Sequence, residues 1–253
     1  MEVLAIDINC DMGESFGPWT MGADDQVMPH ITSANVACGA HAGDPRVMRL
    51  TVRAARAYGV SVGAHPGFAD LQGFGRREMQ VDLSEIEDSI IAQVGALAAI
   101  GRAEGVPLRH VKAHGALYNM AARDRVLADA IARAIKAFDP SLIMFGLPAS
   151  PLIDAGLAAG LRVAAEGFAD RAYEPDGSLT PRSRPGAVIH EPALVVDRAV
   201  RMVRDGVVLT AAGKEIPLQV DTICVHGDTP GASQLTKRIR AGLEAAGIQV
   251  RHL

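Results

Sequence analysis

Short runs of apolar, often β-branched residues alternate along the chain with longer segments whose apolar residues recur at helical spacing. A short apolar run bounded by glycine or polar residues is typical of a buried strand, whereas the longer periodic segments are typical of helices that cover a sheet. We predict seven strands, at residues 3–8, 32–37, 60–63, 108–112, 142–146, 161–165 and 222–225.

Helix-start signals precede several of the periodic segments. Asp44 and Ser150 each stand before a proline, so each is predicted to be the N-cap of a helix that begins with that proline. Ser84 and Glu87 have the spacing of a capping box at the start of the apolar segment 86–103.

This alternation predicts a mostly parallel sheet with helical crossovers. Seven or eight such strands can close into a distorted TIM-like (β/α) barrel, and an open doubly wound sheet fits the periodicity almost as well. A chain of 253 residues without an internal repeat or linker fits a single α/β-barrel domain over residues 1–253. We expect a long ordered loop at 170–191, which is rich in proline and glycine, a hairpin at 207–218 and a last helix at 232–245.

Composition excludes several classes of protein. The net charge is −4 and no cluster of lysine and arginine forms a basic patch, so we expect no nucleic-acid partner. The N-terminus lacks the pattern of a signal peptide, and no apolar run approaches the roughly 18 residues that would span a bilayer, so we expect a cytoplasmic protein that does not enter the membrane. Three scattered cysteines do not suggest a disulfide framework or a CxxC zinc site.

Polar and titratable residues gather at the carboxyl ends of the predicted strands, where α/β proteins build their sites. Four histidines stand at equivalent strand-end positions: His41, His65, His114 and His226. The other candidates at these ends are Asp7, Asn9, Asp11, Glu14, Asn35, Lys112, Glu166, Asp170, Arg171 and Asp228. Packing alone does not explain a set of this size, so we predict an active site there.

Two chemical uses fit this set, and the residues leave both open. Imidazole and carboxylate groups can bind zinc or another divalent ion, with Asp11, His41 and His65 as candidate ligands, although no HExxH pair is present. Alternatively, a carboxylate or histidine activates water beside an amide carbonyl without a metal.

Cationic side chains near the same strand ends suggest an anionic ligand. Lys112 could neutralise an oxyanion or a substrate carboxylate, or could simply pair with an acid in the barrel. Arg76, Arg77 and Arg171 are candidates to anchor a carboxylate or phosphate. The sequence contains no GxxxxGK[ST] element and so does not by itself show an ATP site.

Several sequence blocks resemble the LamB/YcsF family, whose members are also known as the A subunit of 5-oxoprolinase. In chain order the blocks are residues 6–14, 35–44, 63–66, 73–77, 111–119, 166–173 and 224–228. In one departure, Ala113 stands where the family usually has proline, in a Lys-Pro-His-Gly motif. The change leaves Lys112 and His114 in place.

The resemblance implies ATP-coupled opening of the 5-oxo-L-proline lactam to L-glutamate, with release of ADP and phosphate. It implies a barrel related to carbohydrate-deacetylase barrels, ATP as cosubstrate, and partner subunits B and C. A divalent ion would accompany ATP as Mg²⁺ or bind at the site itself.

The resemblance also suggests roles for individual residues. Asp11, Glu14 or Glu166 would be the general base. His41, His65 and His114 would position water, a metal or the carbonyl. Lys112 or Arg77 would bind the substrate carboxylate or phosphoryl group, and Asp228 would orient His226. The remaining substrate-binding candidates are Asp7, Asn9, Asn35, Arg76, Asp170 and Arg171.

Two alternatives remain open. A stand-alone metal-dependent deacetylase or amidohydrolase would use the same histidines without ATP or a partner. A non-catalytic binding or regulatory subunit would keep the pocket but would tolerate the loss of its acids.

Overall fold

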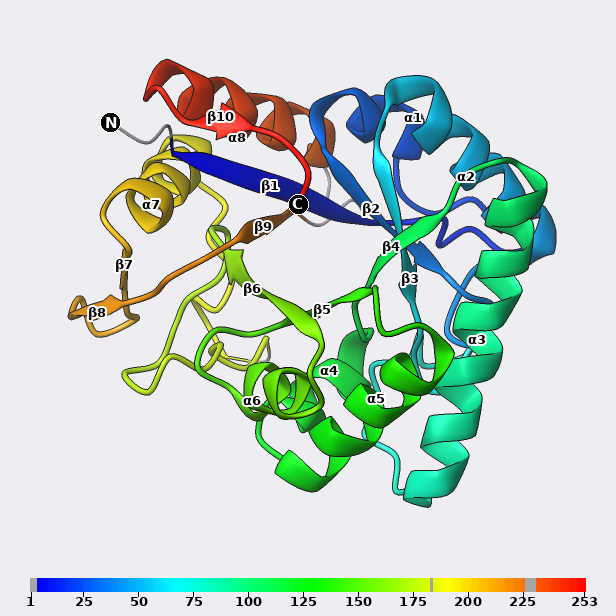
Figure 1. Ribbon diagram of the computed structural model, residues 1–253. Coiled ribbons are helices and arrows are strands. Elements are labelled where there is room, and N and C mark those ends of the chain that lie inside the picture. The colour runs from blue at the N-terminus through cyan, green and yellow to red at the C-terminus, as the bar shows by residue number, and fades with distance from the viewer. Residues whose placement is uncertain (1–3, 183, 226–230) are drawn as a thin grey trace.

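The seven predicted strands form in the computed structural model of the chain and pair side by side into a barrel (Figure 1). The structure describes residues 4–182, 184–225 and 231–253. The barrel strands are β1 (Ala5–Met12), β2 (Ser33–Ala37), β3 (Ser61–His65), β4 (Leu108–Val111), β5 (Ile143–Gly146), β6 (Arg162–Phe168) and β9 (Thr222–Val225). Every neighbouring pair is parallel, and β9 pairs with both β6 and β1. This closure confirms the barrel and rules out the open doubly wound sheet.

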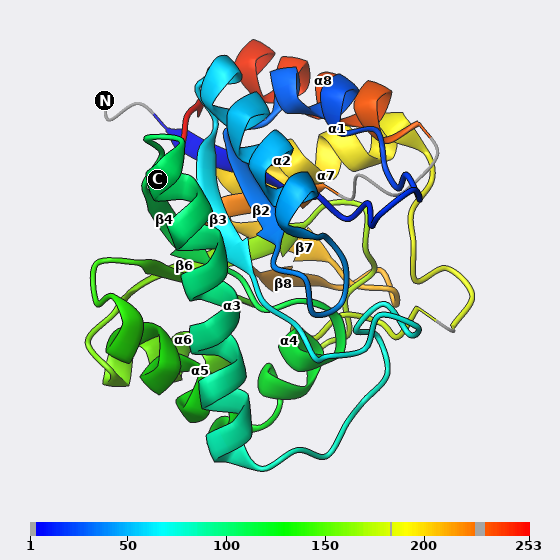
Figure 2. The ribbon, with the colours of Figure 1, turned by 90° about the vertical axis from the view of Figure 1, so that its right-hand side faces the viewer.

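Helices cover the outside of the barrel. The described helices are α1 (Asp24–Val27), the 3₁₀ turn η1 (Met28–His30), α2 (Pro45–Tyr58), α3 (Leu83–Ala103), α4 (Gly115–Ala121), α5 (Arg125–Phe138), α6 (Pro151–Ala158), α7 (Pro192–Arg204) and α8 (Ala232–Ala245). α2 packs against β2 and β3, and α3 packs against β3 and β4 (Figure 2). The main apolar core lies between this layer and the strands. Within the described ranges, no helix is long and apolar enough to cross a membrane.

Smaller elements complete the chain. β7 (Val207–Leu209) and β8 (Glu215–Pro217) form the predicted antiparallel hairpin, and β10 (Gln249–Val250) pairs with the start of β1. The loop at 170–191 contains two isolated bridges and, where it is described, no longer strand or helix, as expected. The last helix has the predicted bounds.

Three strands run past their predicted ends into polar residues, and one of them is β3, which was predicted to end at residue 63 and continues to His65. β1 continues to Met12 instead of ending at residue 8, and Asp7, Asn9 and Asp11 lie on its inner side. β6 likewise continues to Phe168 and includes Glu166. The predicted strands ended too early because the apolar pattern is interrupted where polar residues face the inside of the barrel.

The helix caps were predicted with mixed success. Asp44 caps α2, since its carboxylate accepts hydrogen bonds from the backbone N–H groups of residues 46 and 47. The capping box of Ser84 was wrong, because α3 already begins at Leu83 and Asp82 is the N-cap. Ser150 precedes α6 as predicted, but its hydroxyl donates to the carbonyl of Leu147 instead of capping the helix.

Candidate active site

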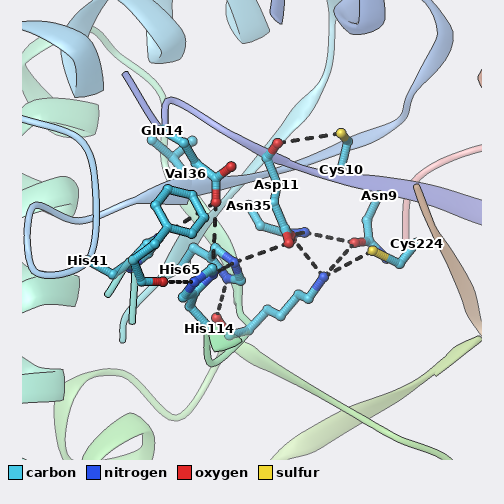
Figure 3. Close-up of polar contacts among 12 residues, drawn as sticks. Asn9, Cys10, Asp11, Glu14, Asn35, Val36, His41, His65, His114 and Cys224 are labelled. Carbon is cyan, nitrogen blue, oxygen red and sulfur yellow. Dashed lines mark hydrogen bonds and ion pairs between the residues drawn. The ribbon is translucent and has the colours of Figure 1, made fainter. Parts of the chain in front are cut away.

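The carboxyl ends of the parallel strands meet at one mouth of the barrel, and the predicted polar residues gather there (Figure 3). Asp11 and Glu14 come from the end of β1 and the loop after it, and His65 is the last residue of β3. His114 follows β4, and the loop after β2 brings in His41. Parallel closure therefore collects into one site residues that are far apart in the sequence.

Glu14, His41, His65 and His114 form one buried cluster, here called the histidine cluster. One ligand atom from each side chain lies within 4.8 Å of the others. Glu14 Oε1 is 3.8 Å from His41 Nε2 and 3.9 Å from His114 Nδ1. The rings of His41 and His114 stack with centroids 3.6 Å apart and planes within 2° of parallel.

Backbone carbonyl groups fix the tautomers of two of these imidazoles. His65 Nδ1 lies 2.7 Å from the carbonyl oxygen of Lys112, and His114 Nε2 lies 2.8 Å from that of Phe74. A carbonyl oxygen can only accept a hydrogen bond, so both of these nitrogens carry a hydrogen. In the neutral imidazoles the other two nitrogens, His65 Nε2 and His114 Nδ1, then face each other with lone pairs at 3.0 Å.

Two histidines of the cluster, His41 and His114, have lowered pKa values. Burial, followed by the charge of His65, lowers the pKa of His114 to about 3. Burial also lowers the pKa of His41 well below its ordinary value, and His114 and His65 contribute further. Neither ring nitrogen of His41 has a hydrogen-bond partner in the described part of the chain.

These features fit a divalent cation. Neutral imidazole nitrogens and a carboxylate are ligands that zinc and similar ions accept, and carbonyl groups behind metal-binding histidines commonly orient them. The cluster could therefore hold a metal ion. It contains two of the predicted ligands, His41 and His65. Asp11 lies at its edge, with Oδ2 3.4 Å from His65 Nε2, and the cluster instead includes Glu14 and His114.

The loop that closes over the cluster has an unusual backbone. Phe74 lies in the left-handed region with φ of 55°, and its ring contacts His41 and His114 edge-on. A non-glycine residue pays a conformational cost in this region, and such strain is often found at functional sites. The strained Phe74 peptide presents its carbonyl oxygen to His114 Nε2. The sequence pattern did not reveal this contribution, since it is made by the backbone.

Lys112 stands beside the histidine cluster and is buried between two acids. Its Nζ lies 2.9 Å from Asp11 Oδ1 and 2.8 Å from Glu166 Oε1, and it also donates to Cys224 Sγ at 3.2 Å. Burial alone would lower the pKa of Lys112, but Asp11 and its other neighbours outweigh burial and raise this pKa well above its ordinary value. Lys112 is therefore a fixed positive charge that links Asp11 to Glu166.

A deeper polar layer lies below the mouth. Both carboxylate oxygens of Asp7 accept hydrogen bonds from hydroxyl groups, namely those of Thr32, Ser33 and Thr222. Asn35 donates to Asn9 and to Asp11, and the His110 ring contacts Asn35 at 2.7 Å. Asp7, Asn9 and Asn35 thus make cross-strand hydrogen bonds inside the barrel, one layer or more from the mouth.

His110 is a buried histidine that the strand-end pattern did not single out. Its ring stacks on Phe145 with centroids 4.3 Å apart, and burial lowers its pKa to about 3. The ring occupies the space beside Gly63, where an added Cβ atom would lie 2.1 Å from it. Its neutral, packed state is that of a structural histidine.

The predicted arginines occupy different environments. Arg77 pairs with the buried Asp70 through two nitrogens and lowers the pKa of that carboxyl group. The Arg76 guanidinium carbon lies 4.9 Å from the centre of the Phe74 ring, at the rim of the histidine cluster.

Arg171 is buried in the loop at 170–191 and donates to the carbonyl groups of Thr180 and Ala187, so it holds this loop in place. Asp170 is also buried there, and its carbonyl accepts from the N–H of Ile189. His226 and Asp228 lie outside the described residues, as do Thr229 and Pro230, which together with Asp228 are expected from the sequence to cap α8.

Known proteins resemble the chain over nearly its whole length. The LamB/YcsF family model matches residues 6–253. A Chloroflexus aggregans protein, named as the A subunit of 5-oxoprolinase, is 58% identical over 249 residues, which cover 98% of this chain and 99% of the relative. A Bordetella pertussis protein of the same name is 53% identical over 247 residues, 98% of each chain.

Solved structures are also similar to the chain over nearly its whole length. The lactam utilization protein from Thermus thermophilus superimposes with a TM-score of 0.95 at 47% identity, covering 99% of this chain and 100% of that one. A putative cellobiose-phosphate cleavage protein from Enterococcus faecalis shares the fold alone, with a TM-score of 0.60 at 14% identity over 99% of this chain and 98% of that one. The whole-length family match and the high identity of the relatives show that the chain belongs to the LamB/YcsF family.

Proposed function

We propose that this chain binds 5-oxo-L-proline at the barrel mouth and, with partner subunits B and C, opens its lactam ring to L-glutamate as ATP is hydrolysed. The names of the relatives support the substrate. The observation that carries a catalytic role is the Asp11–Lys112–Glu166 array directly beside the histidine cluster, in which Lys112 and Glu166 are buried. We place the reaction in the cytoplasm, where ATP is available, and in a single domain formed by the whole barrel.

The array suits a reaction on an unactivated amide. Transfer of a phosphoryl group from ATP to the lactam oxygen would make the ring carbon a stronger electrophile and the oxygen a better leaving group. Water then adds to that carbon after a base removes its proton, and the ring C–N bond breaks as the nitrogen gains a proton, which leaves γ-glutamyl phosphate. A second water hydrolyses this acyl phosphate and releases glutamate and phosphate. The sequence has no phosphate-binding GxxxxGK[ST] loop, so we assign much of the nucleotide handling to the partners.

Residue roles follow from the contacts. Asp11 lies between His65 and Lys112 and is our choice of general base, because it can accept a proton at the mouth while Lys112 balances its charge. Glu166 holds Lys112 from the opposite side. Arg76, whose guanidinium lies over Phe74 at the rim, is our candidate to bind the substrate carboxylate.

Glu14, His41, His65 and His114 would hold a divalent ion if the enzyme uses one. Such an ion would act as a Lewis acid on the amide oxygen. The chain's own contribution is to bury His41 and His114, which lowers their pKa values, and to fix the ring orientations of His65 and His114 through two backbone carbonyl groups.

The deciding experiment measures glutamate release from 5-oxo-L-proline, with and without ATP, by this chain alone and with its B and C subunits. We expect turnover only in the full mixture with ATP. Absence of turnover in the full mixture would refute the substrate assignment. Full turnover after Asp11→Ala or Glu14→Ala would instead indicate that the chain is a non-catalytic subunit.

The histidine cluster favours a second candidate, a metal-dependent amidohydrolase or deacetylase that needs neither ATP nor partners. Its signature would be tightly bound metal in the purified chain together with amide hydrolysis that a chelator abolishes. Hydrolysis by the isolated chain without ATP would establish this candidate in place of the first.

A further inference from the structure

Tyr118 is a buried aromatic residue beside the Asp11–Lys112–Glu166 array. It belongs to α4, the short helix that begins directly after His114, and it is 4% exposed. Its ring meets that of Phe168 edge-on with centroids 6.3 Å apart, and Lys112 Nζ lies 5.7 Å from the centre of the same Phe168 ring. Tyr118, Phe168, Lys112 and Glu166 therefore line one small region inside the mouth.

Three oxygen atoms in this region are shielded from solvent without an aligned hydrogen bond to any described residue. They are the hydroxyl of Tyr118 and both carboxylate oxygens of Glu166. Lys112 Nζ is close to Glu166, but as an ion pair rather than a well-aligned hydrogen bond. Buried polar atoms in this state are uncommon, and catalytic hydrogen bonds are often misaligned until a ligand binds.

The hydroxyl of Tyr118 can act only as a donor toward Glu166. Burial raises its pKa well above the ordinary value, and the Glu166 carboxylate raises it further. The phenol therefore keeps its proton, and its natural acceptor in this region is that carboxylate. A phenylalanine would fill the same space without burying a hydroxyl group, so packing alone does not account for the tyrosine.

We propose that Tyr118 is a positioning residue that holds the carboxylate of Glu166 against Lys112. Lys112 forms ion pairs with both Asp11 and Glu166. The orientation of Glu166 therefore affects the position of Lys112 Nζ and the strength of its ion pair with Asp11 at the mouth. This role deepens the proposed lactam-opening activity and rests on it for its kinetic consequence. The contact itself can be tested without any activity.

Tyrosine labelled with ¹³C at Cζ gives a spectroscopic test in the isolated chain. The chain contains three tyrosines, and Tyr58 is 55% exposed while Tyr173 is fully buried. Single Tyr→Phe variants assign the three resonances. Glu166→Gln should shift the Tyr118 resonance and leave that of Tyr58 in place. An unchanged Tyr118 resonance would overturn the proposal. If Glu166→Gln does not fold, Glu166→Asp, which withdraws the carboxylate by one methylene, replaces it in the same test.

The kinetic test uses the complete enzyme with its partner subunits. Tyr118→Phe should lower kcat by roughly tenfold and leave KM within about twofold, because it removes an interaction that orients a group rather than one that binds substrate. Tyr173→Phe is the matched control, since it also removes a buried hydroxyl near β6, one that accepts a hydrogen bond from the N–H of Phe168. The melting temperature of each variant separates loss of function from loss of structure.

Failure of the positioning role can be distinguished from failure of the proposed function. Unchanged kcat in Tyr118→Phe, alongside an active wild type, would overturn the positioning role. If the wild type itself released no glutamate, the proposed function would fail, and the NMR experiment would still decide whether Tyr118 contacts Glu166.

Discussion

The facing nitrogens of His65 and His114 determine what the histidine cluster can bind. Two unprotonated imidazole nitrogens 3.0 Å apart repel each other unless a proton or a cation lies near both. Burial opposes protonation, since the pKa of His114 is about 3. A divalent cation is therefore the ligand that best satisfies both rings near neutral pH.

We expect the purified chain to bind Zn²⁺ and His65→Ala to weaken that binding at least roughly tenfold, because one of four ligands is lost. Isothermal titration calorimetry measures both affinities. His190→Ala is the control, since His190 is exposed and lies outside the cluster. Equal affinities of the wild type and His65→Ala would rule out this cluster as the metal site.

Lys112 contributes to stability through the acids beside it. Lys112→Met would leave Asp11 and the fully buried Glu166 without their shared cation, and we expect it to lower the free energy of unfolding by about 3–5 kcal/mol. Urea unfolding measures the loss. Lys136→Met removes an exposed lysine from α5 and should change stability by less than about 0.5 kcal/mol.

Adding Glu166→Gln to Lys112→Met should recover part of the loss, because it removes one uncompensated charge. A double variant no more stable than Lys112→Met alone would show that the charge of Glu166 is not the source of the destabilisation.

At the level of elements, Asp44 joins a helix to a loop of the site. Its Oδ1 accepts from the N–H groups of residues 46 and 47 at the start of α2, and its Oδ2 accepts from Gly17 in the loop after β1. That loop also carries Glu14 of the histidine cluster. A single carboxylate therefore caps α2 and fixes the loop beside the cluster.

Asp44→Ala should lower the free energy of unfolding by about 1–2 kcal/mol, the usual cost of losing an N-cap, whereas Asp44→Asn should retain most of the stability. Thermal unfolding of the two variants provides the comparison. A melting temperature for Asp44→Asn as low as that of Asp44→Ala would mean that the side-chain amide cannot replace the carboxylate in these hydrogen bonds.

The strands show how far the sequence can be interpreted. Apolar runs located all seven barrel strands, because their outer faces pack against helices and are apolar whatever lies inside. The same patterns ended β1, β3 and β6 too early, since polar residues follow the apolar run in each strand and contact side chains of other strands inside the barrel. The start of α3 was misplaced because Ser84 and Glu87 have the spacing of a capping box. The helix instead begins at Leu83, with Asp82 as its N-cap.

The sequence likewise predicted only part of the site. Strand-end position brought together His41, His65 and His114, because parallel strands in a closed barrel end on the same side. Periodicity could not separate the mouth from the deeper layer occupied by Asp7 and Asn9. It also could not reveal the roles of Phe74 and Tyr118, which depend on a strained peptide and on tertiary packing.

For the whole molecule, the buried histidines predict an acid-sensitive fold. Burial lowers the pKa values of His110 and His114 to about 3, from an ordinary value of 6.5. As the pH falls below 6.5, these histidines become protonated in the unfolded chain, whereas the folded chain protonates them only near pH 3. The unfolded state therefore binds more protons between these values, and stability decreases as the pH falls.

We expect the two histidines together to cost about 3 kcal/mol of stability between pH 6.5 and pH 5, because the slope for each group rises from half of about 1.4 kcal/mol per pH unit at pH 6.5 towards the full value at pH 5. Urea unfolding at a series of pH values measures this loss. His110→Gln should reduce the slope by about half, whatever its effect on stability at pH 7. A free energy of unfolding that stays constant from pH 7 to pH 5 would contradict the assignment.

The close contact between His110 and Gly63 has a consequence for evolution. A Cβ atom at position 63 would overlap the imidazole of His110, so position 63 cannot accept a larger side chain while His110 is unchanged. Among related sequences, a residue larger than glycine at position 63 should occur only together with a smaller one at position 110. The two positions should therefore be inherited as a pair, and a library that diversifies the barrel interior would have to vary them together.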